Sequence, residues 1–111
     1  MTAALTPALA LAYLRELSVD VRDAVVLDAA GDPVVGTQTL AAAARQLVAS
    51  ADSPVARDGR LLVARTCDGG AIAVLAGDFA LVAVLEHDLV RVARQLVTAS
   101  AQSSETRDFP S

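Results

Sequence analysis

The chain has 111 residues, of which 54% are hydrophobic and 20% charged, a composition typical of one globular domain. A net charge of −4 without a run of arginines argues against nucleic-acid binding, and no apolar stretch approaches the ~20 residues of a membrane-spanning helix. Cys67 is the only cysteine, so no internal disulfide can form, and the apolar N-terminal stretch lacks the basic region of a signal peptide. We therefore expect a cytoplasmic protein.

The first predicted helix begins at Thr6-Pro7, because threonine can cap free N–H groups and proline suits the first helical position. It is expected to end near Ser18. Residues 23–29 are predicted to form a strand, since a short apolar run with β-branched residues lies between two aspartates. Gly31 and Asp32 then predict a turn, and residues 33–36 a return strand at a sheet edge.

A second helix is predicted after a cap at Thr37 or Thr39, extending to Ser50. Its expected inward stripe follows helical spacing and consists of Leu40, Ala43, Ala44, Leu47 and Val48. The expected outward face carries little charge and consists of Ala41, Ala42, Arg45, Gln46 and Ala49. A solvent-facing helix normally carries more charge, so we expect another chain to cover part of this face.

Residues 51–59 are predicted to form a loop, followed by three strands over residues 60–67, 71–76 and 79–85. The last two strands are almost wholly apolar, as is typical of central strands covered on both faces. A final helix is predicted from Glu86 to Ala101. The domain should thus span residues 1–101, and the polar segment 102–111 is expected to be a disordered tail.

These elements predict an α/β fold of the α+β type, in the order α-β-β-α-β-β-β-α. Tight turns join most of the strands, so the five-stranded sheet should be mainly antiparallel. Helices are expected on both of its faces, because the last two strands have apolar residues on both sides.

Two segments resemble the Roadblock/LC7 family, whose fold is profilin-like. Residues 28–36, Asp-Ala-Ala-Gly-Asp-Pro-Val-Val-Gly, look like the family's first hairpin. Residues 77–85, Gly-Asp-Phe-Ala-Leu-Val-Ala-Val-Leu, resemble its last strand leading into the C-terminal helix. The resemblance covers about residues 5–100.

This resemblance implies a homodimer or heterodimer that pairs through its third-strand edge and second helix, making one sheet across the dimer. Bacterial members of the family act with small Ras-like GTPases as regulators or scaffolds. Here the third strand would be residues 60–67. The implied dimer contacts, in that strand and the second helix, are Leu61, Leu62, Val63, Ala64, Arg65, Leu40, Ala44 and Leu47. The implied partner-binding residues are Ala41, Ala42, Arg45 and Gln46.

No catalytic, cofactor or metal site is predicted. His87 is the only histidine and lacks the serine motif of a hydrolase, while His87 and Cys67 alone make no metal site. Glu86 and Asp88 are read as charge at a helix start. The turn at residues 68–70 has neither the spacing nor the lysine of a phosphate-binding loop. We therefore expect a non-enzymatic protein.

Two other functions stay open from the residues alone: a profilin-like ligand-sensing domain, and a small hydrolase or transferase. A pocket with convergent polar groups would favour the first of these. For the dimeric module, we expect aspartate at Leu62 or Val63 to break the dimer, since these residues are predicted to lie on a pairing edge.

Overall fold

The computed structural model describes residues 6–17 and 20–96. The helices and strands follow one another in the predicted order. The predicted cap of the first helix is also present, because the Thr6 hydroxyl accepts a hydrogen bond from the Leu9 N–H. The elements are α1 (Pro7–Leu17), β1 (Val21–Leu27), β2 (Pro33–Gly36), α2 (Gln38–Ser50), β3 (Val55–Asp58), β4 (Leu61–Arg65), β5 (Ala71–Ala76) and α3 (Val82–Gln95).

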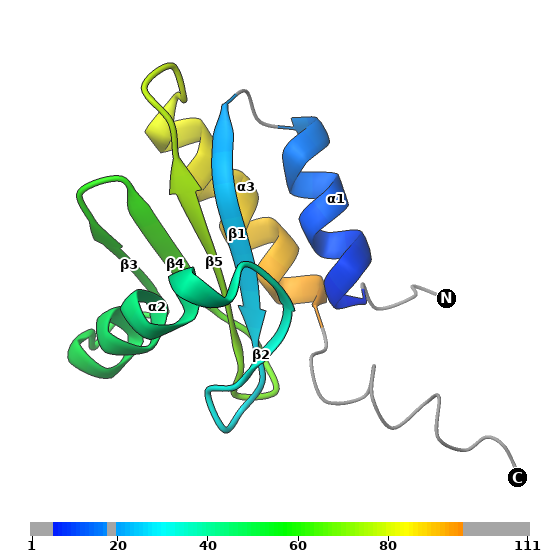
Figure 1. Cartoon of the computed structure of the whole chain (residues 1–111), viewed down its shortest axis with the longest axis vertical. Coiled ribbons are helices and arrows are strands. Elements are labelled where there is room, and N and C mark those ends of the chain that lie inside the picture. The colour runs from blue at the N-terminus through cyan, green and yellow to red at the C-terminus, as the bar shows by residue number, and fades with distance from the viewer. Residues whose placement is uncertain (1–5, 18–19, 97–111) are drawn as a thin grey trace, which may run out of the picture.

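The five strands form one sheet in the order β2-β1-β5-β4-β3, and every neighbouring pair is antiparallel (Figure 1). Strands β1 and β5 are paired along nearly their whole length, from Val21 opposite Ala76 to Leu27 opposite Ala71. The predicted fold class, a five-stranded antiparallel sheet with helices on both faces, is confirmed.

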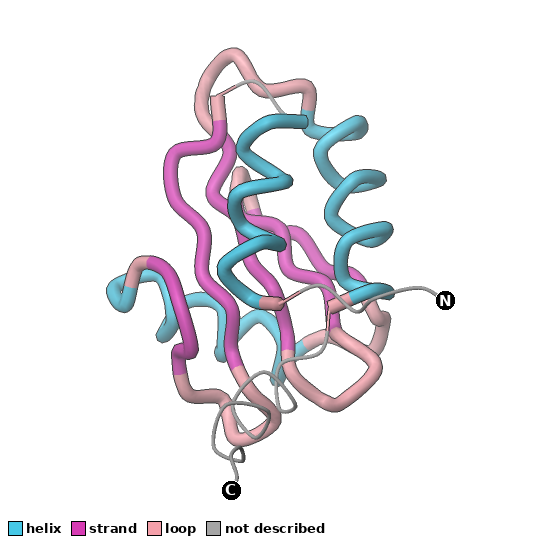
Figure 2. Tube along the Cα trace, turned by 90° about the vertical axis from the view of Figure 1, so that its right-hand side faces the viewer, coloured by secondary structure: helices cyan, strands magenta, loops and turns pink. Residues whose placement is uncertain are grey.

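Each face of the sheet has its own apolar core. Helices α1 and α3 lie side by side on one face (Figures 1 and 2), where Leu14, Leu89 and Ile72 are fully buried. Helix α2 lies on the other face, with Leu40 and Ala44 packed against the strands. Residues alternate between the two cores along each strand, as the pleat requires. Consecutive β4 residues therefore enter opposite cores, and the central strands have no exposed face.

The turn from β2 to α2 depends on Gly36, which has a φ of +106°. A Cβ at this position would overlap the carbonyl oxygen of Ala24 and lie 2.7 Å from the Cα of Val25. The same carbonyl accepts a hydrogen bond of 3.0 Å from the Thr37 N–H, at the N-cap of α2. Glycine thus lets the chain turn tightly against β1 at the start of α2.

The predicted strand over residues 79–85 is wrong. These residues form part of the turn after β5 and the beginning of α3, which starts at Val82 and not at Glu86. Buried Leu85, Leu89 and Val92 follow helical spacing and pack in the core. The periodicity of a short apolar run cannot distinguish a strand from a helix. In this structure the segment is buried on one side only, which is compatible with a helix on the surface of the sheet.

The predicted loop over residues 51–59 contains a strand, β3, which forms a hairpin with β4. Gly59 has a φ of +60° at the first position of the two-residue connection, where two-residue hairpin turns require a positive φ. Residues 60–67 were expected to form the third, edge strand. This expectation is also wrong, because β4 lies inside the sheet, between β3 and β5. Strand β3 is the third strand in the chain, and it forms the edge of the sheet.

The predicted continuation of the last helix to Ala101 and the polar tail 102–111 lie outside the described residues. None of the helices in the described part of the chain is long and apolar enough to span a membrane.

Candidate interaction surface

Within residues 6–17 and 20–96, strand β3 has one unpaired edge. The hydrogen-bonding pattern of β3 follows from its hairpin with β4. The Arg65 N–H donates to the Pro54 carbonyl at 2.8 Å, and Ala56 lies opposite Val63. In an antiparallel pair, residues that bond to the neighbouring strand alternate with residues whose N–H and C=O point away. The outward main-chain groups of β3 are therefore those of Val55 and Arg57, and the Val55 N–H also donates to the Ser53 hydroxyl at 3.4 Å.

The opposite edge, β2, is a poorer pairing surface. It begins with Pro33, which has no N–H, and ends at Gly36. Its pairing with β1 is also irregular, with a register shift between Val26 and Leu27. Proline and bulges are two ways in which proteins protect sheet edges from pairing. Strand β3 has neither feature, so it is the edge better suited to accept another strand.

The exposed face of α2 adjoins this edge. Its residues are small or uncharged except for Arg45, and they are Gln38, Thr39, Ala42, Ala43, Arg45, Gln46, Ala49 and Ser50. The helix packs on the same side of the sheet as Val63, the residue opposite Ala56 of β3. A helix face whose only charged residue is Arg45 and an unpaired strand edge therefore lie next to each other on one side of the molecule.

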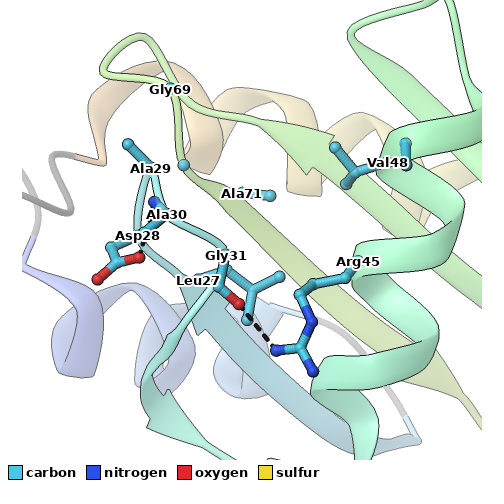
Figure 3. A pocket seen from close by; sticks show the side chains of 11 residues that line it. Leu27, Asp28, Ala29, Ala30, Gly31, Arg45, Val48, Gly69 and Ala71 are labelled. Atoms are coloured by element: carbon cyan, nitrogen blue, oxygen red, sulfur yellow. Dashed lines mark hydrogen bonds between the residues drawn. The ribbon is translucent and has the colours of Figure 1, made fainter.

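Two arginines fix α2 in place. Arg65 of β4 donates through Nη2 to the carbonyls of Val48 at 2.7 Å and Ala51 at 3.2 Å, at the C-terminal end of the helix. A cation suits that position because the last carbonyls of a helix lack partners and carry partial negative charge. Arg45 donates through Nη1 to the Gly31 carbonyl at 2.9 Å, which ties α2 to the β1–β2 turn (Figure 3).

A hollow of about 310 Å³ lies between α2, the β1–β2 turn and the β4–β5 turn (Figure 3). Its lining is largely apolar and includes Leu27, Val48 and Ala71. The polar side chains are already engaged, because the Asp28 carboxylate accepts bonds from its own turn and Arg45 bonds to Gly31. The convergent polar groups expected of a ligand-sensing pocket are absent from this hollow.

The structure separates the sequence-predicted contact residues into two groups. Those on the surface are Ala42, Arg45, Gln46 and Arg65, with Leu47 half-buried. Those buried within the protomer are Leu61, Leu62, Val63, Ala64, Leu40, Ala41 and Ala44. The buried group cannot meet a second chain without unfolding. The prediction that aspartate at Leu62 or Val63 breaks the dimer is wrong in its reason, since neither residue lies on an edge. Val55 and Arg57, which do lie on the edge, were not predicted.

The candidate chemical groups are scattered. Among the residues that the structure describes, no three histidine, cysteine, aspartate or glutamate side chains gather as metal ligands would. His87 is exposed on α3, 3.8 Å from the Asp88 carboxylate. Exposed Cys67 lies in the β4–β5 turn, with its sulfur 3.9 Å from the Arg94 carbonyl. In the described part of the chain, neither side chain lies beside both a base and a group that orients the base, as a nucleophilic site needs.

No protein-family model matches the chain, and no curated protein matches it. A search of solved structures finds the crystal structure of a Roadblock/LC7 domain from Streptomyces avermitilis. The match has a TM-score of 0.57 and 20% sequence identity, and covers 86% of this chain and 94% of that one. The predicted resemblance is thus confirmed at the level of the fold, which is that of a Roadblock/LC7 domain. Of the two segments on which it rested, residues 28–36 include the β1–β2 turn and β2, whereas residues 77–85 form a turn and the start of α3 and not a strand.

Proposed function

We propose that this protein is a non-enzymatic interaction module that forms a homodimer through β3 and α2, and that the dimer regulates or scaffolds a small Ras-like GTPase in the cytoplasm. The observation that carries the proposal is the unpaired edge of β3 beside a helix with one charged residue in its whole length. The Roadblock/LC7 fold supports it, because pairing of this kind was the expectation drawn from the family resemblance.

The side chains of β3 favour one register of a symmetric pair over another. If Ala56 faces its own copy, Val55 lies opposite Arg57 of the second copy, and the outward N–H and C=O groups of both residues can bond. If Arg57 faces its own copy instead, two cations lie directly opposite each other, which is destabilising. The first register also places the smallest side chain of β3 at the symmetry axis, on the side where α2 lies.

Two four-residue strands bury too little surface for a stable dimer, which needs about 800 Å² from each partner. Helix α2 supplies the rest in this proposal. Its exposed alanines, Ala42, Ala43 and Ala49, let a second helix approach closely, and few charges would have to be desolvated. Arg45 and Gln46 lie on the same exposed surface and remain the predicted contacts to the GTPase.

Replacing Arg57 by proline tests the dimer directly. The substitution removes an N–H that points away from β4, so the hairpin itself loses no hydrogen bond and proline is tolerated at such an edge position. The symmetric dimer loses two hydrogen bonds and gains a steric conflict with the proline ring. We expect dimer affinity to fall by roughly tenfold or more, with the fold retained. Light scattering after size-exclusion chromatography gives the mass, and circular dichroism the fold.

The matched control is Arg57→Ala, which removes the same side chain but keeps the N–H. It should remain dimeric at micromolar concentration. A wild-type protein that is monomeric at that concentration would contradict the proposal. So would an Arg57→Pro variant that dimerises as tightly as the alanine variant.

The GTPase part of the proposal has its own test. Purified small Ras-like GTPases from the same organism, loaded with GDP or with a non-hydrolysable GTP analogue, are titrated with the dimer by calorimetry. We expect one of them to bind with a preference for one nucleotide state, and Arg45→Ala together with Gln46→Ala, which add no charge to the α2 face, to weaken that binding while the dimer persists. Equal absence of binding across all of these GTPases would overturn this part and leave the dimer proposal standing.

A further inference from the structure

A second hollow lies on the other face of the sheet, between α3 and the β3–β4 hairpin. Its volume is about 330 Å³. Val55 of β3 and Ala64 of β4 line it from the sheet, and Val90, Ala93 and Arg94 line it from α3. Binding sites for small molecules have volumes of roughly 300–1,000 Å³ and a mainly apolar lining. This hollow is therefore large enough to hold a small ligand.

The charged residues that border this hollow are cationic. Arg65 and Arg94 line it, and none of its lining residues in the described part of the chain is acidic. The Arg65 guanidinium is already engaged, since it donates to two carbonyls at the end of α2. Arg94 is exposed and makes no ion pair with any residue in 6–17 or 20–96. Arg94 can therefore bind an anion at the edge of an otherwise apolar hollow.

Pairing of β3 with a second copy would bring another arginine to the hollow. Val55 packs against the core formed with α1 and α3, so its side chain and that of Arg57, two residues later, point to this face of the sheet. In the register in which Ala56 faces its own copy, Arg57 of the second copy lies opposite Val55, with Cβ atoms roughly 5 Å apart. The long arginine side chain can then reach the hollow that Val55 lines. Each hollow of the dimer would have one arginine from each copy.

Two guanidinium groups beside an apolar hollow favour one class of ligand. The planar guanidinium group donates two parallel hydrogen bonds to the two oxygens of a carboxylate. An aliphatic chain attached to that carboxylate buries its apolar surface against the lining of the hollow. An inorganic anion gains nothing from the apolar lining, and a neutral hydrocarbon gains nothing from the arginines. An aliphatic carboxylic acid uses both.

We propose that the β3-paired dimer binds two molecules of a small aliphatic carboxylic acid, one in each hollow. The alkyl chain packs against Val55 and Val90 of one copy. The carboxylate lies between Arg94 of that copy and Arg57 of the other. The site rests on the proposed dimer, because one of its two arginines comes from the second copy. It lies on the face of the sheet opposite α2, so a bound acid leaves the exposed surface of α2 free.

Octanoate is the probe for this site. It is titrated into the isotope-labelled protein, and the methyl signals of Val55 and Val90 are followed by NMR. We expect saturable shifts with one octanoate per protomer. Arg94→Ala and Arg57→Ala should each weaken the binding about tenfold, because each removes a charged hydrogen-bond donor. Octan-1-ol, which has the same chain without the charge, should also bind about tenfold more weakly than octanoate.

The matched control is Arg91→Ala, which removes an exposed arginine on the side of α3 that adjoins Tyr13 of α1. It should bind octanoate like the wild type. Equal octanoate affinity of wild type and Arg57→Ala would overturn the shared site, as would octanol that binds as tightly as octanoate. Light scattering on the same samples gives the oligomeric state. A dimer without octanoate shifts overturns the site and leaves the dimer standing, whereas a monomeric wild type overturns both.

Discussion

Replacing Leu62 by aspartate is expected to unfold the domain. Leu62 is fully buried in β4, in the core formed with α1 and α3. Loss of a buried leucine costs about 2–5 kcal/mol, and an unpaired buried charge adds several more. A domain of this size is stable by about 5–15 kcal/mol, so the two losses together remove most or all of its stability. Circular dichroism and a thermal scan should show no cooperative transition.

Leu81→Asp is the matched control, because it makes the same chemical change at a leucine that is 69% exposed. Leu81 is the N-cap of α3 and provides no side-chain hydrogen bond there. Aspartate is favoured at this position, where it stabilises a helix by about 1 kcal/mol. The control should melt at or slightly above the wild-type temperature. A Leu62→Asp protein that unfolds within a few degrees of wild type would contradict the assignment of β4 to the interior of the sheet.

Gly36→Ala is expected to have the second-largest effect. The new methyl group would overlap the Ala24 carbonyl, and a φ of +106° is strained for any residue with a side chain. We estimate a loss of roughly 2–5 kcal/mol in the free energy of unfolding, from backbone strain and overpacking together. Urea denaturation measures the change.

Gly59→Ala is the control that separates the cost of backbone strain from the cost of steric overlap at the new Cβ. Gly59 also has a positive φ, +60°, but no atom lies within 4 Å of a Cβ built there. Its replacement should cost only about 1–2 kcal/mol, which is the penalty for an ordinary residue in the left-handed region. If Gly36→Ala lowered the free energy of unfolding no more than Gly59→Ala, this would contradict the close contact between the β2–α2 turn and β1.

The sequence predicted the elements whose patterns are locally complete. Helix α1 has its cap at Thr6, and β1 and β2 are bounded by aspartates and a Gly31 turn. The prediction for residues 79–85 was wrong because a short apolar stretch fits a buried strand or a helix start equally well. Strand β3 was missed because its sequence lacks a strand pattern. Its four residues carry two charges and follow a proline, and only pairing with β4 makes them a strand.

These two errors moved the predicted edge by one strand. The count of five strands was right, but residues 60–67 were assigned the place that β3 occupies. On α2, the four consecutive alanines 41–44 hide the phase of the helix, so the pattern could not show that Ala41 is buried and Ala43 exposed. Arg45 and Gln46 were assigned correctly to the exposed face because a polar side chain fixes the phase where alanines cannot.

Hydrogen exchange at β3 tests the central claim most directly. Within one protomer the N–H groups of Val55 and Arg57 point away from β4, but that of Val55 already donates to the Ser53 hydroxyl at 3.4 Å. The N–H of Ala56 faces Val63. If β3 pairs with a second copy, the Arg57 amide is slow to exchange at high protein concentration and becomes fast on dilution, while Ala56 stays protected throughout. Fast exchange of Arg57 at every concentration would contradict the β3-paired dimer.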